Sequence, residues 1–199
     1  TGLVSPYTNS VVGGEKIYVR VQNNTTKCIN TTNSFDLKLN VLPKANAVSS
    51  IIKCDDNSVG DDKDGFISSF DLSSQTSTIL GDQSSDDYTV TYHISQADAD
   101  DTTSTGLTSP YTNTNKGGDK IYVRVLDNNS GCYRSSTSFN VTVAPLPDVK
   151  TLITVEQCDD VETNDGKSIF NLSDNESFIS SDYQNETFEY YTASDFNVS

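Results

Sequence analysis

Acidic side chains crowd into one short stretch of the chain and suggest a cation site. Five carboxylates lie within ten positions after Cys54: Asp55, Asp56, Asp61, Asp62 and Asp64. Calcium in proteins takes about six to eight oxygen ligands, and carboxylates supply many of them. The stretch is not an EF-hand, because Gly60 would stand at the first ligand position. It predicts either a site for calcium or a similar divalent ion, or a solvated acidic turn between two strands, where aspartate is common in any case.

The four cysteines are spaced for disulfide chemistry. Cys28 and Cys132 are 104 residues apart, and so are Cys54 and Cys158. No pair forms a C-x-x-C motif, and His93 is the single imidazole, so the pattern argues against a zinc or redox site. It favours disulfides in an oxidising compartment.

Two disulfide pairings are open from the sequence. A repeated unit with two cysteines closes on itself most simply through a bond from Cys54 to Cys132, which is the pairing we predict. The alternative joins Cys28 to Cys54 and Cys132 to Cys158, and therefore requires the chain to fold back at the boundary between repeats.

The sequence indicates no catalytic residues. His93 lies in an alternating segment without a second histidine or a reactive serine or cysteine beside it, so we expect it at the surface or rim of a sheet. A pair of carboxylates for glycoside hydrolysis would need a cleft, which a small repeated β module seldom forms. We therefore expect no enzymatic activity.

The elements that must position these residues recur along the chain. Residues 1–43 reappear as residues 105–147 without a gap, with 22 of 43 positions identical. Leu-Pro pairs at 42–43 and 146–147 mark the module ends. They predict the C-terminal part of one module in residues 1–43, a complete module in residues 44–147, and the N-terminal part of the next in residues 148–199. The apolar faces of both partial modules are expected to be exposed, with Ile17, Val19 and Val21 on one and Phe170, Phe188 and Tyr190 on the other.

Within the complete module the pattern is that of β structure. Apolar residues alternate with polar ones along residues 88–94, 121–125 and 139–143, as strands with one buried face require. Residues 48–53 and 66–72 predict two further strands, and residues 105–113 allow another. Residues 127–131 are turn formers that make a hairpin, and residues 96–101 predict one helical turn. This is an all-β fold class, an immunoglobulin-like or fibronectin-like β-sandwich in a tandem, elongated array.

The formal net charge of −15 limits the partners. Such a chain repels phosphate backbones and anionic lipid, so we expect no nucleic-acid partner and no membrane insertion. Calcium is the only cofactor that the sequence suggests. Neighbouring modules of the same polypeptide are the natural partners, and a surface polysaccharide is a further candidate.

The repeat as a whole resembles a known family. The segments Ser5-Pro6-Tyr7-Thr8-Asn9 and Ile17-Tyr18-Val19-Arg20-Val21 are followed by a cysteine, a Leu-Pro pair, a Cys-Asp-Asp triplet and Phe70-Asp71-Leu72. This set looks like the tandem modules of giant flavobacterial surface proteins that the type 9 secretion system exports, including gliding-motility adhesins.

The resemblance implies an adhesive or stalk role at the cell surface, with no activity in the modules themselves. Together with the repeat, it predicts a non-enzymatic segment of a long extracellular adhesin or filament. A carbohydrate-binding appendage of a secreted polysaccharide-degrading enzyme and a structural surface-layer or matrix protein are the alternatives.

Overall fold

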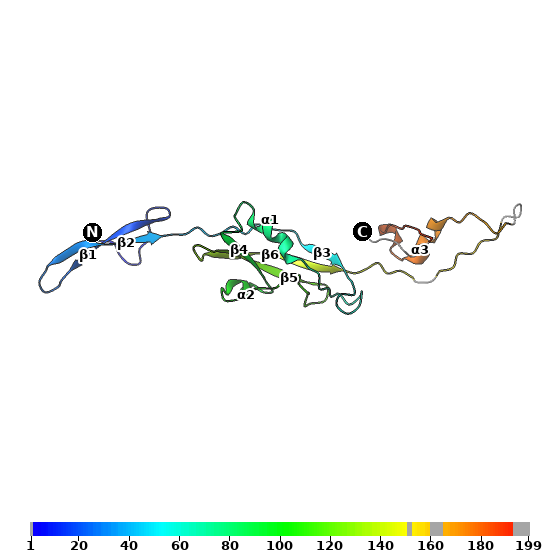
Figure 1. The fold of residues 1–199 in the computed structure, drawn as a ribbon, viewed down its shortest axis with the longest axis horizontal. Coiled ribbons are helices and arrows are strands. Elements are labelled where there is room, and N and C mark those ends of the chain that lie inside the picture. The colour runs from blue at the N-terminus through cyan, green and yellow to red at the C-terminus, as the bar shows by residue number, and fades with distance from the viewer. Residues whose placement is uncertain (1, 151–152, 160–164, 193–199) are drawn as a thin grey trace. The chain divides into compact units, whose positions relative to one another are not determined.

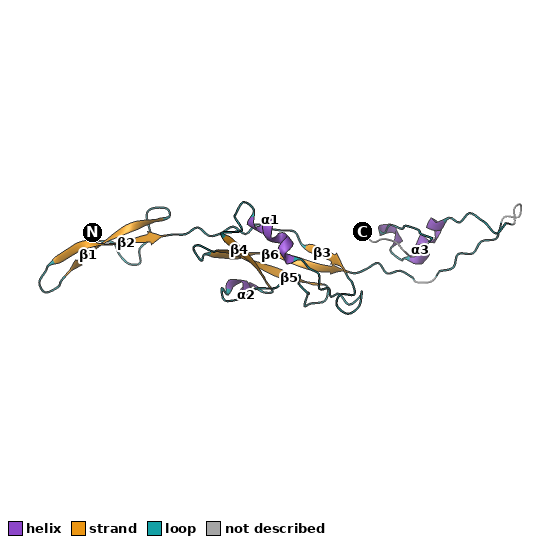
Figure 2. Ribbon diagram, viewed as in Figure 1, coloured by secondary structure: helices purple, strands orange, loops and turns teal. Residues whose placement is uncertain are grey.

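The structure is a computed structural model that describes residues 2–150, 153–159 and 165–192 (Figure 1). The chain divides into two compact units, Thr1–Ala144 and Pro145–Ser199. Figure 2 shows mostly strands and loops, with a few short helices. In the part of the chain that is described, no helix is long and apolar enough to span a membrane.

The centre of the first unit is a four-stranded sheet with the order β3-β6-β5-β4. Its strands are β3 (Ile51–Cys54), β4 (Tyr88–His93), β5 (Gly118–Asp127) and β6 (Tyr133–Ala144). The β4–β5 and β5–β6 pairs are antiparallel, whereas β3 runs parallel to β6. The strands predicted from alternation are therefore confirmed, and so is the hairpin between β5 and β6.

One face of this sheet carries the hydrophobic core. Ile121, Val123 and Val125 on β5 are fully buried, and they alternate with Tyr122 and Arg124, which lie on the other face of the strand. Phe139 on β6 and Tyr92 on β4 add an edge-to-face aromatic pair with ring centroids 6.1 Å apart. This face is the one whose side chains the sequence pattern identified.

Short helices rather than a second sheet cover that core in the described residues of the module. The 3-10 helix η1 (Leu72–Gln75) continues into α1 (Thr76–Leu80), and both place buried leucine or isoleucine side chains in the core. The strand predicted over residues 66–72 is wrong, because only Phe70 pairs, in an isolated bridge with Tyr111. The sequence thus predicted the β-rich class correctly, but the opposing sheet of a sandwich is not seen.

Helix α2 (Gln96–Asp100) follows β4 and confirms the predicted helical turn. The hydroxyl of Ser95 caps it by accepting the backbone N–H of Asp98 at 3.1 Å. Because α2 contacts the side chains of β4 and β5 that alternate away from the core, it lies on the other side of the sheet from α1 (Figure 1).

A two-stranded hairpin precedes this sheet. Its strands β1 (Gly14–Gln22) and β2 (Ile29–Lys38) repeat the β5–β6 pair. Ile17 pairs with Phe35 as Ile121 pairs with Phe139, and both hairpins shift register at the equivalent place. The local sequence is therefore sufficient to build the hairpin twice.

The second unit contains only short helical segments among its described residues: η2 (Leu172–Asn175), α3 (Glu176–Ile179) and η3 (Tyr183–Asn185). The η2–α3 pair repeats η1–α1 of the complete module.

The predicted exposure of both partial modules is confirmed. Phe35 in the hairpin is 53% exposed, and Phe170 in the second unit is 44% exposed. Ile17 and Val19 are half-buried and Val21 is exposed, whereas their counterparts on β5 are fully buried. Of the other residues of the second unit predicted to be exposed, Phe188 is half-buried and Tyr190 is exposed.

Candidate functional site

Cys54 lies at the end of the module where the chain leaves the sheet. It is the last residue of β3 and pairs in register with Ala144, the last residue of β6. The next residue extends this contact, because the N–H of Asp55 donates to the carbonyl of Ala144 at 2.9 Å. The thiol is exposed. We call this end of the module the downstream end.

Cys132 lies at the opposite end, where the chain enters the module. It immediately precedes β6, and its carbonyl accepts the N–H of Asp127 at 2.8 Å across the turn. Two residues further on, Nε of Arg134 donates to the carbonyl of Pro43 at 2.7 Å. Cys132 therefore belongs to the end that contains residues 43–45, which we call the upstream end.

The predicted bond between Cys54 and Cys132 does not fit this structure. The twelve residues of β6 lead from Cys132 to Ala144, a length of roughly 35–40 Å at about 3.3 Å per residue. A disulfide needs Cα atoms within about 7 Å. The sequence argument failed because it took closure within one repeat as the simplest solution, and it could not see that β3 runs parallel to β6.

The remaining cysteines repeat these two positions. Cys28 immediately precedes β2, and its carbonyl accepts the N–H of Asn23 at 2.9 Å, as at Cys132. Cys158 is the counterpart of Cys54 in the second unit. All four cysteines carry free thiols, and three of them are exposed. The four cysteines thus occupy two equivalent positions of the repeat, Cys28 with Cys132 and Cys54 with Cys158.

The acidic stretch after β3 does not bring its carboxylates together around a cation. The structure contains no group of three or more histidine, cysteine, aspartate or glutamate side chains in residues 2–150, 153–159 and 165–192 that could hold a metal. The carboxylates turn instead toward backbone amides: Asp56 to Ser58, Asp61 to Lys63, and Asp64 to both Asp61 and Phe66. This geometry supports the solvated-turn interpretation.

One member of the stretch is buried and has a structural role. Oδ2 of Asp55 accepts the N–H of Gly65 at 2.8 Å and so closes the loop. The carbonyl of Gly65 in turn accepts Nδ2 of the buried Asn113 at 2.9 Å, and Oδ1 of Asn113 accepts the N–H of Ile67 at 2.8 Å. The loop is therefore fixed to the segment that precedes β5.

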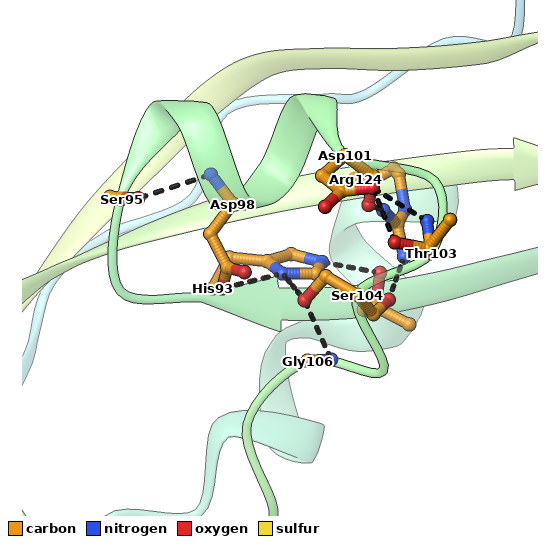
Figure 3. Close-up of polar contacts among 9 residues, drawn as sticks. His93, Ser95, Asp98, Asp101, Thr103, Ser104, Gly106 and Arg124 are labelled. Atoms are coloured by element: carbon orange, nitrogen blue, oxygen red, sulfur yellow. Dashed lines mark hydrogen bonds and ion pairs between the residues drawn. The ribbon is translucent and has the colours of Figure 1, made fainter.

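A second polar cluster lies between β4 and α2 (Figure 3). His93 is fully buried, which corrects the expectation of a rim position. Its Nδ1 lies 3.1 Å from Oδ2 of Asp98, and its Nε2 lies 2.8 Å from Oγ1 of Thr91. The guanidinium of Arg124, also buried, donates to the carbonyls of Asp101 and Ser104. Sequence reasoning missed Arg124, whose only signal was a charge between two valines of the alternating segment 121–125.

Thr91, His93 and Asp98 are arranged like a hydroxyl nucleophile with its general base and orienting carboxylate. The surroundings of these residues nevertheless indicate a structural role. Burial lowers the pKa of His93, and the nearby positive charge of Arg124 lowers it further, while the hydrogen bond to Asp98 opposes both. The neutral imidazole is fully enclosed and cannot reach a substrate. The cluster holds α2 on the sheet.

A third cluster holds the segment before β5. The hydroxyl of Tyr111 donates to Oδ2 of Asp119 at 2.7 Å, and the N–H of Thr114 donates to the same oxygen. Burial is the main cause that raises the pKa of Tyr111 to about 12. Tyr111 is buried, so its ring belongs to the core and its hydroxyl to this cluster.

One family model matches part of the chain. Residues 50–147 match the sequence model of the Flavobacterium inter-domain disulphide bond domain (FIDD). No curated protein and no solved structure matches the chain significantly. The matched range contains Cys54, Cys132 and the whole four-stranded sheet. A likeness to this flavobacterial domain indicates an extracellular or periplasmic protein.

Proposed function

We propose that this chain is a spacer segment of a long flavobacterial surface adhesin or filament, whose successive modules are cross-linked by disulfides. The modules are tandem β modules, and none of them carries an enzymatic activity. The observation that carries the proposal is the placement of Cys54 and Cys132 at opposite ends of one module.

The path of the chain supports a spacer. It enters the complete module at residues 43–45, beside Arg134 and Thr137 at the start of β6, and leaves it after Ala144 at the other end of the same strand. A module built in this way adds the length of one long strand to the array. Tandem copies therefore give reach, which suits an adhesin shaft.

The same path brings one cysteine of each module to the next joint. The end of β6 is followed three residues later by Pro147, the counterpart of Pro43 in the next module. Three residues span at most about 10 Å. The downstream end of one module, with Cys54, then lies near the upstream end of the next, which carries that module's counterpart of Cys132. We assign the disulfide to this pair.

The chemistry requires an external oxidant. Two thiols form one S–S bond and give up two protons and two electrons to a dithiol-disulfide oxidoreductase or a small disulfide of the compartment. A cross-link at each joint restrains bending and limits unfolding when the filament is pulled. That property is useful in an adhesin, and it is compatible with a stalk that carries a ligand-binding tip elsewhere.

Non-reducing tryptic mass spectrometry of the full-length protein from the cell surface tests the proposal. Cleavage after lysine and arginine gives peptide 54–63 with Cys54 and peptide 125–134 with Cys132. We expect each to be linked to a peptide from an adjoining module, and both links to disappear on reduction. A direct link between peptides 54–63 and 125–134 of the same module, or free thiols in both, would contradict the proposal.

A further inference from the structure

A short stretch of the chain crosses the complete module from its upstream end to its downstream end. We call this stretch, residues 44–54, the entry span. Near its start the carbonyl of Ala45 accepts the hydroxyl of Thr137 at 2.7 Å, and at its end Cys54 pairs in register with Ala144. The chain thus advances nine residues in the entry span beside seven residues of β6, which leaves a slack of at most about 10 Å.

A second stretch crosses the module in the same direction. This exit span, residues 132–147, begins at Cys132, contains the whole of β6 and continues to the joint with the next module. A β-strand is already nearly extended, so the exit span has little length to release. Because β3 is parallel to β6, the two spans run side by side toward the downstream end (Figure 1).

The rest of the module, residues 55–131, joins the end of one span to the start of the other. It leaves the downstream end at Asp55 and returns to the upstream end before Cys132. It contains η1, α1, β4, α2 and β5, and it supplies much of the core, including the fully buried Phe70 and Ile121. We call it the central fold.

The disulfides assigned above give the array two covalent paths that avoid the central fold. One path follows the exit span of a module, crosses the joint by the peptide backbone, and follows the entry span of the next module. It crosses the following joint through the disulfide, from the counterpart of Cys54 to the counterpart of Cys132 in the module beyond, where another exit span begins. The second path is the same, displaced by one module.

We infer that tension on the oxidised array is carried by the entry and exit spans alone, and that residues 55–131 are shielded from it. The inference rests on the proposed function, because it requires a disulfide at each joint. From Cys132 to Cys158 there are 27 residues, so a path reaches at most about 50 Å per module when fully stretched. The central fold then opens without lengthening the shaft.

Reduction removes the shielding and makes the array extensible. A dithiol reductant gives two electrons and two protons to each disulfide, which leaves two thiols, and the reductant itself becomes a cyclic disulfide. Tension then enters each module at residues 43–45, leaves it after Ala144, and pulls β3 and β6 in opposite directions. Once these strands separate, the 104 residues of one repeat stretch to roughly 350 Å.

Single-molecule force spectroscopy of the full-length protein tests the inference through the two cysteines of one module. The oxidised wild type should show no unfolding step below the forces that break covalent bonds. Cys54→Ser interrupts one path and Cys132→Ser interrupts the other, so each single variant should still show no step. The double variant interrupts both paths in the same module and should add one step of about 300 Å.

The single variants are matched controls, because each lacks one thiol and keeps one whole path. A long step in either of them would overturn the inference, since a bond closed within one module would give that result. A double variant without the step would overturn it as well. The fully stretched length reports the covalent path even if the altered module does not fold, so misfolding cannot hide the outcome.

Reduction and peptide mapping complete the test. Dithiothreitol should give every module of the wild type a step of about 300 Å, and an array that stays inextensible after reduction would contradict the assigned load path. Absence of the linked peptides described above would refute the disulfide joints themselves. Linked peptides together with long steps in the oxidised wild type would place the bonds between separate filaments, which refutes the shielding but not the cross-linking.

Discussion

Nδ1 of His93 lies 3.1 Å from Oδ2 of Asp98, which joins the buried end of β4 to the first turn of α2. Arg124 lies on the same side of the sheet and binds the carbonyls of Asp101 and Ser104. One imidazole and one guanidinium, both enclosed, therefore fix the segment between β4 and the residues that lead to β5.

The stability of the complete module should depend on pH near neutrality through His93. Its pKa is lowered by burial, so the unfolded state binds the proton more tightly than the folded state does. The stability that depends on a neutral His93 is fully present above the unfolded pKa of about 6.5. It is lost as the pH falls below that value toward the folded pKa.

Urea unfolding between pH 7.5 and pH 5 measures this dependence. His93→Gln should abolish the dependence in that window, because the aspartates of the cluster, including Asp98, have lowered pKa values and titrate at more acidic pH. If the unfolding free energy of the variant changed with pH as steeply as that of the wild type, groups other than His93 would be the cause of the pH dependence.

Arg124→Ala should destabilise the module by about 1–3 kcal/mol, since two carbonyls that accept its guanidinium lose their donor in a buried place. Arg20 is the counterpart in the β1–β2 hairpin and is exposed. Arg20→Ala should change the free energy of unfolding by less than about 0.5 kcal/mol. Equal effects of the two substitutions in denaturant titrations would contradict the structural role assigned to Arg124.

Asn113→Ala should loosen the acidic loop without any change in its charge. The buried amide bridges Gly65 and Ile67, and its loss leaves the N–H of Ile67 without its acceptor at a cost of about 1–3 kcal/mol, while the carbonyl of Gly65 keeps the N–H of Gly117 as a donor. Hydrogen exchange at Gly65 and Ile67 should accelerate. Asn9→Ala is the control, because Asn9 is the counterpart of Asn113 in the first repeat. Its side chain donates to the carbonyl of Val11 in its own loop. Protection that survives in Asn113→Ala would refute this anchor.

Calcium should have little effect on the module. The aspartates after β3 already accept backbone N–H groups of their own turn, so a cation would have to break those bonds to recruit them. We expect the same melting temperature in millimolar calcium and in excess chelator. A melting temperature that is higher in calcium than in chelator would contradict this expectation. If Asp61→Asn or Asp62→Asn abolished that difference, the result would support the calcium site that the sequence suggested.

The sequence by itself determined the repeat and the local structure that the repeat encodes. Alternation of apolar residues located β4, β5 and β6, and turn formers located the hairpin, because strand periodicity and turn chemistry are properties of neighbouring residues. Identical stretches in residues 1–43 and 105–147 folded into equivalent hairpins, although only one of them has a complete core.

Only the tertiary structure decided where the cysteines lie and what covers the core. The direction of β3 beside β6 places Cys54 and Cys132 at opposite ends, and no local pattern encodes the direction in which two distant strands pair. The sequence around Phe70 predicts a strand, but in the structure Phe70 comes just before the helix η1 and packs in the core. Its partner Tyr111 is about forty positions away, so no local pattern could show this. His93 was misplaced for the same reason: burial is a property of the elements that pack on a residue, and α2 encloses this one.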